Sequence, residues 1–296
     1  MTSQTAPRVL VGHGTENDFV VLPDPDGNVW PEDRLDGALV RRLCDRRAGL
    51  GGDGVLRVVR SVHVPDARAV LGEGLASCEW FMDHRNADGS TAEMCGNGIR
   101  LFLHVLVSEG LLDRATCEAG VLVGTRGGPR RVGATPDGAY WVDMGPAREF
   151  GAGEAGLAGR TFAGLAVSMG NPHLACLTDA DLDGLDLTGP PSFDAGLFPD
   201  GVNVELVNVV EPGAHVRLRV VERGVGETRS CGTGACAAMA AAARRAGEGG
   251  ATSYVVDVPG GRLTVSRRPD GQVELTGPAV LVAEGALRPE WLASHR

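Results

Sequence analysis

The chain has 296 residues, with 38 acidic and 28 basic side chains and a formal net charge of −10. This charge argues against nucleic acid or an anionic membrane surface as a partner. No apolar stretch approaches the roughly 20 residues that span a bilayer, and residues 1–8 lack the apolar core of a signal peptide. We therefore expect a cytoplasmic globular protein, and its length predicts two domains.

Basic residues and cysteines restrict the chemistry further. All 28 basic residues are arginine, because the sequence contains no lysine. Pyridoxal-phosphate enzymes hold their cofactor as a Schiff base on a lysine, so composition excludes that class. Seven cysteines, an odd number in a chain without a secretory signal, predict free thiols rather than a disulfide framework. No spacing of Cys, His and carboxylate residues predicts a metal site.

Short β-branched runs alternate with Gly, Pro and Asp turns along the chain. In chain order we predict turns at 26–27 and 88–89, a helix over 99–112, a loop over 124–131, a turn at 137–138, a loop over 151–159, strands over 202–206 and 216–222, a helix over 235–246, a strand over 255–258, a turn at 270–271 and a strand over 273–276. Many strands with one buried helix per half predict an α+β fold in which each sheet curves around its helix.

The domain boundary is expected near residues 130–136, where the Gly/Arg-rich loop ends. We place it between 133 and 134, which gives an N-terminal domain of residues 1–133 and a C-terminal domain of residues 134–277. The C-terminal segment from about 278 to 296 is expected to return to the first domain.

Two matching segments stand out, Met94-Cys95-Gly96-Asn97-Gly98 and Ser230-Cys231-Gly232-Thr233-Gly234, each opening into an apolar helical run. A helix N-terminus leaves backbone N–H groups unpaired and carries about half a positive charge, so it favours a thiolate and can hold a carboxylate. The glycines let a substrate approach the backbone closely. The pair therefore predicts two reactive thiols presented in the same way. An interdomain disulfide or half of a metal site is the alternative.

The other polar segments are informative only in combination with the pair of cysteines. Glu222-Arg223-Gly224 ends a predicted strand nine residues before Cys231, which favours a position near that thiol. The remaining cysteines are expected to act as small hydrophobic residues: Cys44, Cys78, Cys117, Cys176 and Cys236.

Seven segments together resemble the diaminopimelate epimerases, in the family's order and over essentially the whole chain. They are Asn17-Asp18-Phe19, Asn86-Ala87-Asp88-Gly89-Ser90, Met94 to Arg100, Met169-Gly170-Asn171-Pro172-His173, Val202-Asn203, Glu222 to Thr228 and Ser230 to Gly234. Asn97 and Glu222-Arg223 distinguish the chain from the related proline racemases, which carry His and an Asp-Arg-Ser-Pro segment at the corresponding places.

The resemblance implies two pseudo-symmetric domains, each a curved, mostly antiparallel, barrel-like sheet around a central helix, with the active site in the interdomain cleft. It implies conversion of L,L-2,6-diaminopimelate to the meso form, without cofactor or metal, for lysine and peptidoglycan synthesis. Diaminopimelate would be the small-molecule partner, and a homodimer is expected.

Inversion of an α-carbon needs an acid or base on each face, and the resemblance assigns these roles to Cys95 and Cys231. Backbone N–H groups of Gly96, Asn97, Gly232 and Thr233 would stabilise charge on the reacting carboxylate. The resemblance also places Glu222 near the reacting ammonium group and makes His173 and Glu222 tuners of thiol pKa. The distal end of the substrate would be held by Asn17, Asn86, Asn171, Asn203 and Arg223.

Two alternatives stay open on sequence alone. Another cofactor-independent racemase or isomerase of the same fold would share the thiols and differ in the distal pocket. A non-enzymatic amino-acid-binding protein would join Cys95 and Cys231 in a disulfide.

Overall fold

The computed structural model describes residues 6–247 and 252–294. The chain forms two compact units, the first from Met1–Tyr140 with Ala279–Arg296 and the second from Trp141–Pro278. The C-terminal segment reaches the first unit as strand β18 (Val280–Ala286), which pairs antiparallel with β1 (Arg8–Gly14). Residues 1–5, part of the segment predicted to lack a signal-peptide core, and residues 295–296, part of the returning segment, lie outside the described residues.

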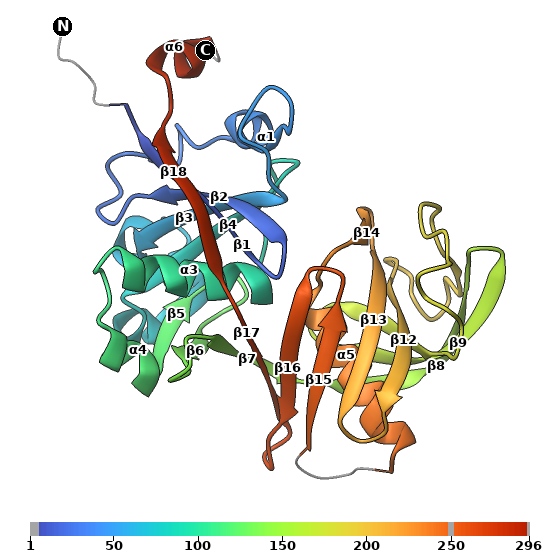
Figure 1. Cartoon of the computed structure of the whole chain (residues 1–296). Coiled ribbons are helices and arrows are strands. Elements are labelled where there is room, and N and C mark those ends of the chain that lie inside the picture. The colour runs from blue at the N-terminus through green and yellow to red at the C-terminus, as the bar shows by residue number, and fades with distance from the viewer. Residues whose placement is uncertain (1–5, 248–251, 295–296) are drawn as a thin grey trace, which may run out of the picture. The chain divides into compact units, whose positions relative to one another are not determined.

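The sheet of the first unit runs in the order β18, β1, β2, β3, β4, β5, β6. Its further strands are β2 (Asn17–Pro23), β3 (Gly54–Arg60), β4 (Trp80–Asn86), β5 (Val121–Gly124) and β6 (Arg130–Ala134). Helix α3 (Gly96–Ser108) packs against most of these strands (Figure 1). Smaller elements are α1 (Gly37–Cys44), η1 (Ser61–His63), α2 (Ala67–Leu71), η2 (Gly72–Ser77), α4 (Arg114–Ala119) and α6 (Pro289–Ala293).

The second unit is built around helix α5 (Gly232–Arg245), which packs against strands from β9 to β17 (Figure 1). The main strands, in sheet order, are β8 (Arg148–Leu157), β9 (Arg160–Ser168), β10 (Pro172–Leu177), β12 (Asn203–Glu211), β13 (His215–Glu222), β15 (Thr252–Val258), β16 (Gly261–Arg267) and β17 (Gln272–Gly277). The short strands β11 (Ser192–Phe193) and β14 (Gly226–Thr228) pair with β8 and β13, and β7 (Tyr140–Pro146) pairs with β17.

The two units repeat one topology. In the first, the pairings β1–β2, β2–β3, β3–β4, β4–β5 and β5–β6 are antiparallel, parallel, antiparallel, parallel and antiparallel, with α3 between β4 and β5. The second shows the same series for β9–β10, β10–β12, β12–β13, β13–β15 and β15–β16, with α5 between β13 and β15. The predicted α+β fold with one central helix per half is confirmed, and Cys95 and Cys231 hold equivalent places immediately before these helices.

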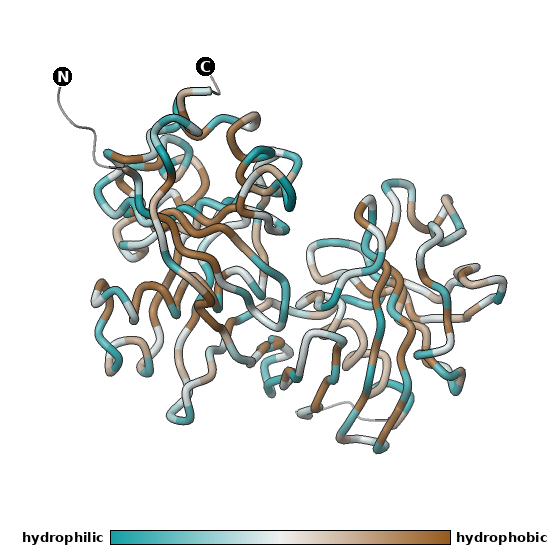
Figure 2. The backbone as a smooth tube through the Cα atoms, turned by 45° about the horizontal axis from the view of Figure 1, so that its top comes forward, coloured by the Kyte–Doolittle hydropathy of each residue, from teal (hydrophilic) through white to brown (hydrophobic). Residues whose placement is uncertain are grey.

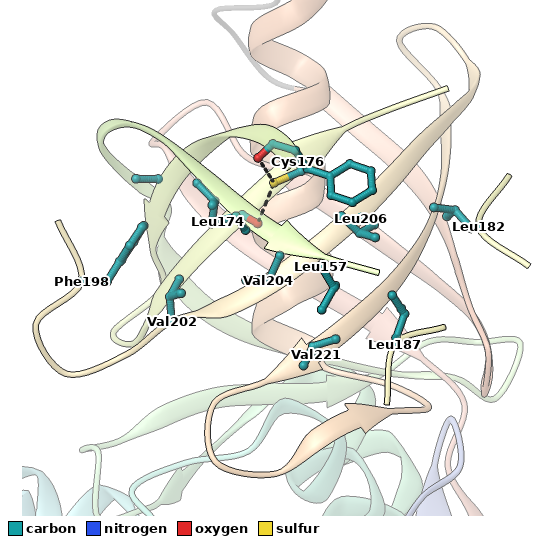
Figure 3. Packing of buried hydrophobic residues seen from close by; sticks show 13 residues of the cluster. Leu157, Leu174, Cys176, Leu182, Leu187, Phe198, Val202, Val204, Leu206 and Val221 are labelled. Carbon is teal, nitrogen blue, oxygen red and sulfur yellow. Dashed lines mark hydrogen bonds between the residues drawn. The ribbon is translucent and has the colours of Figure 1, made fainter. Parts of the chain in front are cut away.

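Apolar residues concentrate in the strands and central helices, whereas loops are mostly hydrophilic (Figure 2). Helix α5 is lined with buried alanines, which keep its surface narrow and favour the helical backbone. Strand β12 is covered on both faces, because its side chains alternate. One face carries Val204 and Leu206 into an apolar cluster with Leu174, Phe198 and Leu182 (Figure 3). The other face packs toward α5.

The loop predicted over 151–159 is wrong. Strand β8 continues to Leu157 and β9 begins at Arg160, with Ala158 and Gly159 forming the turn at φ of 52° and 71°. Positive φ at both central residues is the geometry of a two-residue hairpin turn that matches strand twist. The Gly/Ala composition has weak strand propensity, but pairing with β9 and burial of Ala155 and Leu157 outweigh it.

The helices that the structure describes include none that is both long and apolar enough to cross a membrane.

Candidate active site

Cys95 and Cys231 are the N-cap residues of α3 and α5. Both have extended backbone conformations, and each sulfur accepts a hydrogen bond from the backbone N–H three residues later, at 3.3 Å from Gly98 and 3.4 Å from Gly234. This N–H group and the positive end of the helix dipole both favour a thiolate. The two units therefore present their predicted thiols in the same way.

In the first unit, the side chain of Asn17 orients the groups around Cys95. Its Oδ1 accepts from Cys95 Sγ at 3.5 Å and from Asn97 Nδ2 at 3.3 Å, while its Nδ2 donates to Asp53 Oδ2 at 2.8 Å. Asn97 is buried, and its Oδ1 accepts from Arg100 Nη2 at 2.6 Å. Asn17 and Asn97, both predicted to bind substrate, thus make hydrogen bonds within the protein beside the thiol.

The guanidinium of Arg100 lies buried behind the thiol-bearing turn. It donates from Nε to the carbonyl of Gly96 at 3.2 Å and from Nη2 to Thr15 Oγ1 at 3.2 Å. Burial lowers the pKa of Arg100 to about 10, and the charge of Cys95 acts in the opposite sense. That attraction is mutual, so Arg100 favours the thiolate of Cys95.

Thr15 and Glu16 form the turn between β1 and β2 with φ of 49° and 61°, a conformation that a β-branched residue rarely adopts. The hydrogen bond from Arg100 holds Thr15 in place. Asn86 ends β4 at an exposed position, where its Nδ2 donates to Ser90 Oγ at 3.0 Å.

In the second unit, a chain of hydrogen bonds leads from the interior to Cys231. Its sulfur lies 3.4 Å from Thr233 Oγ1, and Asn171 Nδ2 donates to the same hydroxyl oxygen at 3.4 Å. Asn171 Oδ1 lies 3.0 Å from His173 Nε2, and His173 Nδ1 lies 2.6 Å from Glu205 Oε1. This chain joins four residues that were predicted for the site and ends at Glu205, which was not predicted.

The pKa of Cys231 is raised well above its ordinary value. Burial is the largest cause, followed by the negative charges of Glu222 and Glu205, while hydrogen bonds from Thr233 and the Gly234 N–H act in the opposite direction. Desolvation and like charges both disfavour a thiolate. The surroundings of Cys231 therefore favour the protonated thiol.

The amide of Asn203 connects two segments of the second unit. Its Nδ2 donates to the carbonyl of Pro172 at 2.9 Å, and its Oδ1 accepts from the backbone N–H of Arg223 at 2.9 Å. Glu222 accepts a hydrogen bond from the hydroxyl of Thr228. The exposed guanidinium of Arg223 donates from Nη1 to the carbonyl of Asp200 at 2.9 Å. Asn203 therefore positions the backbone that carries Glu222 and Arg223.

Glu205, Asp53 and Arg100 were not among the residues predicted for the site. Arg100 had a usable signal, since it is a charged residue in a run that is otherwise apolar on most faces. Glu205 alternates with Val204 and Leu206 and therefore looked like a solvent-facing position, yet it is fully buried because α5 covers that face of β12. Asp53 sits in a glycine-rich turn, where its contact with Asn17 depends on tertiary structure.

All seven cysteines are free thiols, and the five expected to be small hydrophobic residues are buried. Within residues 6–247 and 252–294, groups of three or more His, Cys, Asp or Glu side chains that could hold a metal ion are absent.

The fold is shared with solved structures of a racemase and an epimerase. It matches a hydroxyproline epimerase from Agrobacterium vitis with a TM-score of 0.64 at 17% identity, covering 99% of this chain and 96% of that one. A probable proline racemase from Agrobacterium radiobacter gives a TM-score of 0.64 at 16% identity, covering 97% and 95%. At these identities the likeness concerns the fold.

Sequence comparison then defines the family. The model of the family described as diaminopimelate epimerase matches residues 9–150 and 165–282. A diaminopimelate epimerase from Thermobifida fusca is 52% identical over 281 residues, covering 95% of this chain and 98% of the relative. One from Streptomyces coelicolor is 51% identical over 292 residues, covering 96% of each. The chain belongs to the diaminopimelate epimerase family.

Proposed function

We propose that this protein inverts one α-carbon of L,L-2,6-diaminopimelate to give the meso isomer, with Cys95 and Cys231 as the acid and base. The reaction would supply lysine and peptidoglycan synthesis in the cytoplasm. We also propose that the protein acts as a homodimer.

The observation that carries this proposal is the duplicated thiol geometry. In each repeat, a cysteine is the N-cap of the central helix. The sulfur of that cysteine accepts a hydrogen bond from one backbone N–H of the helix. Inversion at carbon needs one group to remove a proton from one face and another to deliver a proton to the opposite face. A duplicated fold with one thiol in each copy meets that need.

The environments of the two thiols differ. The Cys95 thiol donates to Asn17 Oδ1 and the buried cation of Arg100 favours loss of its proton, whereas burial, Glu222 and Glu205 favour a thiol at Cys231. We assign Cys95 as the first base and Cys231 as the first acid. Each turnover adds a proton to one sulfur and removes a proton from the other sulfur. The roles of acid and base therefore exchange between the two cysteines when the reaction runs in reverse.

The α-proton of an amino acid is weakly acidic, so negative charge that develops on the carboxylate must be stabilised. The first turns of α3 and α5 offer backbone N–H groups at Gly96, Asn97, Gly232 and Thr233, and one preorganised donor is worth about 3–4 kcal/mol of barrier. Lysine-based electron sinks are excluded because the sequence has no lysine.

The non-reacting end of the substrate carries an ammonium and a carboxylate. The exposed Arg223 suits the carboxylate, since a guanidinium can bind both oxygens. We assign Glu222 to the reacting ammonium, and Asn86 and Asn171 to the distal end. Asn17, Asn97 and Asn203 make hydrogen bonds within the protein, so we assign them mainly to positioning the neighbouring groups.

The decisive experiment is an assay of the purified, reduced protein with L,L-diaminopimelate and no added cofactor, in the presence of a chelator. Formation of the meso isomer is expected, with pyridoxal phosphate adding nothing. Proline and hydroxyproline serve as comparison substrates. Turnover of either with no turnover of diaminopimelate would overturn the substrate assignment, and recovery of activity only with a divalent metal would overturn the cofactor-free mechanism.

A further inference from the structure

Glu205 and His173 form a buried acid–base pair below the turn that carries Cys231. Both side chains have zero exposure, and Glu205 Oε1 lies 2.6 Å from His173 Nδ1. They are diagonal neighbours on the parallel strands β10 and β12, because His173 pairs with Asn203 and Glu205 pairs with Ala175, and both lie on the face that packs against α5. A charged group this deeply buried is costly unless paired.

The carboxylate lies directly against the first turn of α5. A Cβ built on Gly234 would lie 2.8 Å from Glu205 Oε1 and 3.3 Å from Cys231 Cβ. The glycine therefore makes room for the carboxylate next to the thiol. The second oxygen, Oε2, is buried and has no hydrogen-bond partner among the described residues.

Hydrogen bonds determine how many protons the pair holds. Asn171 Nδ2 donates to Thr233 Oγ1, so its Oδ1 faces His173 and Nε2 must carry a hydrogen. One further proton lies between Nδ1 and Oε1. It can be bound to the ring, giving an imidazolium beside a carboxylate, or to the carboxyl group, giving a neutral ring and a neutral acid. The pair has zero net charge in both arrangements.

Three other titratable groups lie near this pair. Cys231 starts α5, and the negative charges of Glu205 and of Glu222 at the end of β13 both disfavour its thiolate. Cys176 of β10 belongs to the apolar cluster on the opposite face of the sheet and is also influenced by the charge of Glu205. Burial, with a contribution from Glu205, raises the pKa of Cys176 to about 12, so that thiol keeps its proton near neutral pH. Of the two thiols, Cys231 is the one that the proposed reaction ionises.

We propose that Glu205 and His173 are a charge-responsive pair for Cys231: the shared proton rests on His173 while Cys231 is a thiol and moves to Glu205 when Cys231 becomes a thiolate. In this step the Nδ1–H bond breaks and an Oε1–H bond forms, with no change in the net charge of the pair. A negative carboxylate beside a thiolate is thereby avoided.

The proposal rests on the proposed function, because epimerisation converts Cys231 between thiol and thiolate in every turnover. Glu205 is a positioning residue here, since it acts on the sulfur through charge and through His173. As a consequence, the free-energy difference between the thiol and the thiolate of the buried Cys231 becomes moderate. A group that acts as an acid in one direction of the reaction and as a base in the other needs both states to be accessible.

The first test follows the ring nitrogens of His173 by NMR in the full-length, reduced, ligand-free protein from neutral to alkaline pH. As Cys231 ionises, Nδ1 is expected to change from protonated to unprotonated while Nε2 stays protonated. The signal is assigned by its loss in His173→Gln. The change should be absent in Cys231→Ser, which keeps a hydrogen-bonding side chain and cannot ionise in this range.

Ring shifts that stay constant while Cys231 ionises, or that change identically in Cys231→Ser, would overturn the proposal. This measurement needs no turnover. A protein that shows the coupled NMR change but does not convert diaminopimelate would therefore overturn the proposed function and leave the pair intact.

The second test uses Glu205→Gln, which keeps the shape and cannot release a proton. Alkylation of Cys231 by iodoacetamide, measured by mass spectrometry against pH, should reach its midpoint about one pH unit lower than in the unaltered protein, a tenfold gain in thiolate. Cys95 in the same molecules serves as the internal reference and should not shift. An unchanged or higher midpoint for Cys231 contradicts the proposal.

Leu206→Val is the matched control. Leu206 adjoins Glu205 on β12 but belongs to the apolar cluster on the opposite face (Figure 3). It should perturb the strand without shifting the Cys231 midpoint, and an equal shift in this control would show that the effect of Glu205→Gln is merely structural. If Glu205→Gln fails to fold, the NMR comparison with Cys231→Ser still decides the question.

Discussion

Asp53 accepts a 2.8 Å hydrogen bond from the amide nitrogen of Asn17, and this contact determines which end of that amide faces Cys95. With Nδ2 held by the carboxylate, Oδ1 is left to accept from the thiol and from Asn97. Asp53 itself is held by Arg46, whose Nη2 lies 2.9 Å from Oδ1. A residue outside the predicted site thus orients one inside it.

Asp53→Ala should lower kcat by about tenfold or more, because a hydrogen bond to a charged group is worth about 1.5–3 kcal/mol and its loss frees the amide to rotate. Steady-state kinetics with L,L-diaminopimelate measures this. Asp18→Ala is the control, since Asp18 shares Arg46 but its carboxylate does not bond the Asn17 amide. Equal losses in both variants would contradict the role given to Asp53.

Gly98 and Gly234 occupy the same place in the two repeats but have different surroundings. A Cβ at Gly234 would meet Glu205 Oε1 at 2.8 Å, whereas at Gly98 its nearest neighbours lie at 3.4 Å. We expect Gly234→Ala to destabilise the fold by about 1–3 kcal/mol through overpacking. Gly98→Ala should cost much less, because alanine also favours the helix. Chemical denaturation of both variants tests this, and a larger cost at Gly98 would contradict it.

Epimerisation in D2O separates two bases from one. Starting from the L,L isomer, early meso product should carry deuterium at the inverted carbon, because the delivering thiol has equilibrated with solvent. Recovered substrate should carry almost none. Replacing either Cys95 or Cys231 by alanine should abolish inversion. Early product that keeps the original hydrogen would show a single base serving both faces. Mass spectrometry at low conversion gives the answer.

The buried carboxylate of Asp83 links stability to pH. Burial alone would raise its pKa, but the charges of Arg126, Arg85 and Arg57 outweigh burial and hold the pKa below its ordinary value. A lowered folded-state pKa means that this stabilisation is complete above the unfolded value of about 3.9 and is lost as pH falls through the folded value.

We therefore expect the free energy of unfolding to fall steeply below roughly pH 4. Asp83→Asn should cost about 3–5 kcal/mol at neutral pH, because it removes the buried carboxylate that Arg57, Arg85 and Arg126 share, and should flatten the acid branch. Urea denaturation at several pH values measures both. Asp183→Asn, at an exposed ion pair with Arg217, is the control and should change stability far less than Asp83→Asn.

The helices and the thiol-bearing turns were predictable from sequence because their signals are local. Cys95 and Cys231 precede glycines and apolar runs, and the capping geometry follows from those few residues. The part of strand β8 within residues 151–157 was not predictable, because its Gly/Ala composition favours a turn and pairing with β9 and β11 holds it in the sheet.

The burial of Glu205 was not predictable for a related reason. Alternation predicts which side chains share a face of β12, but not what covers that face. The substrate roles suggested for Asn17 and Asn97 came from family resemblance. The hydrogen bond from Asn17 to Asp53 joins positions 36 apart in the sequence, whereas Arg100 reaches Asn97 from three residues along the same helix.

The sulfur atoms of Cys95 and Cys231 are the reactive groups and also the N-cap acceptors of helices α3 and α5. An electrophile that bonds to either sulfur makes it a poorer acceptor for the N–H of Gly98 or Gly234. Covalent inhibition should therefore loosen the first turn of α3 or α5 and speed amide hydrogen exchange there. The helix in which exchange becomes faster would therefore identify the thiol that a mechanism-based inhibitor has modified.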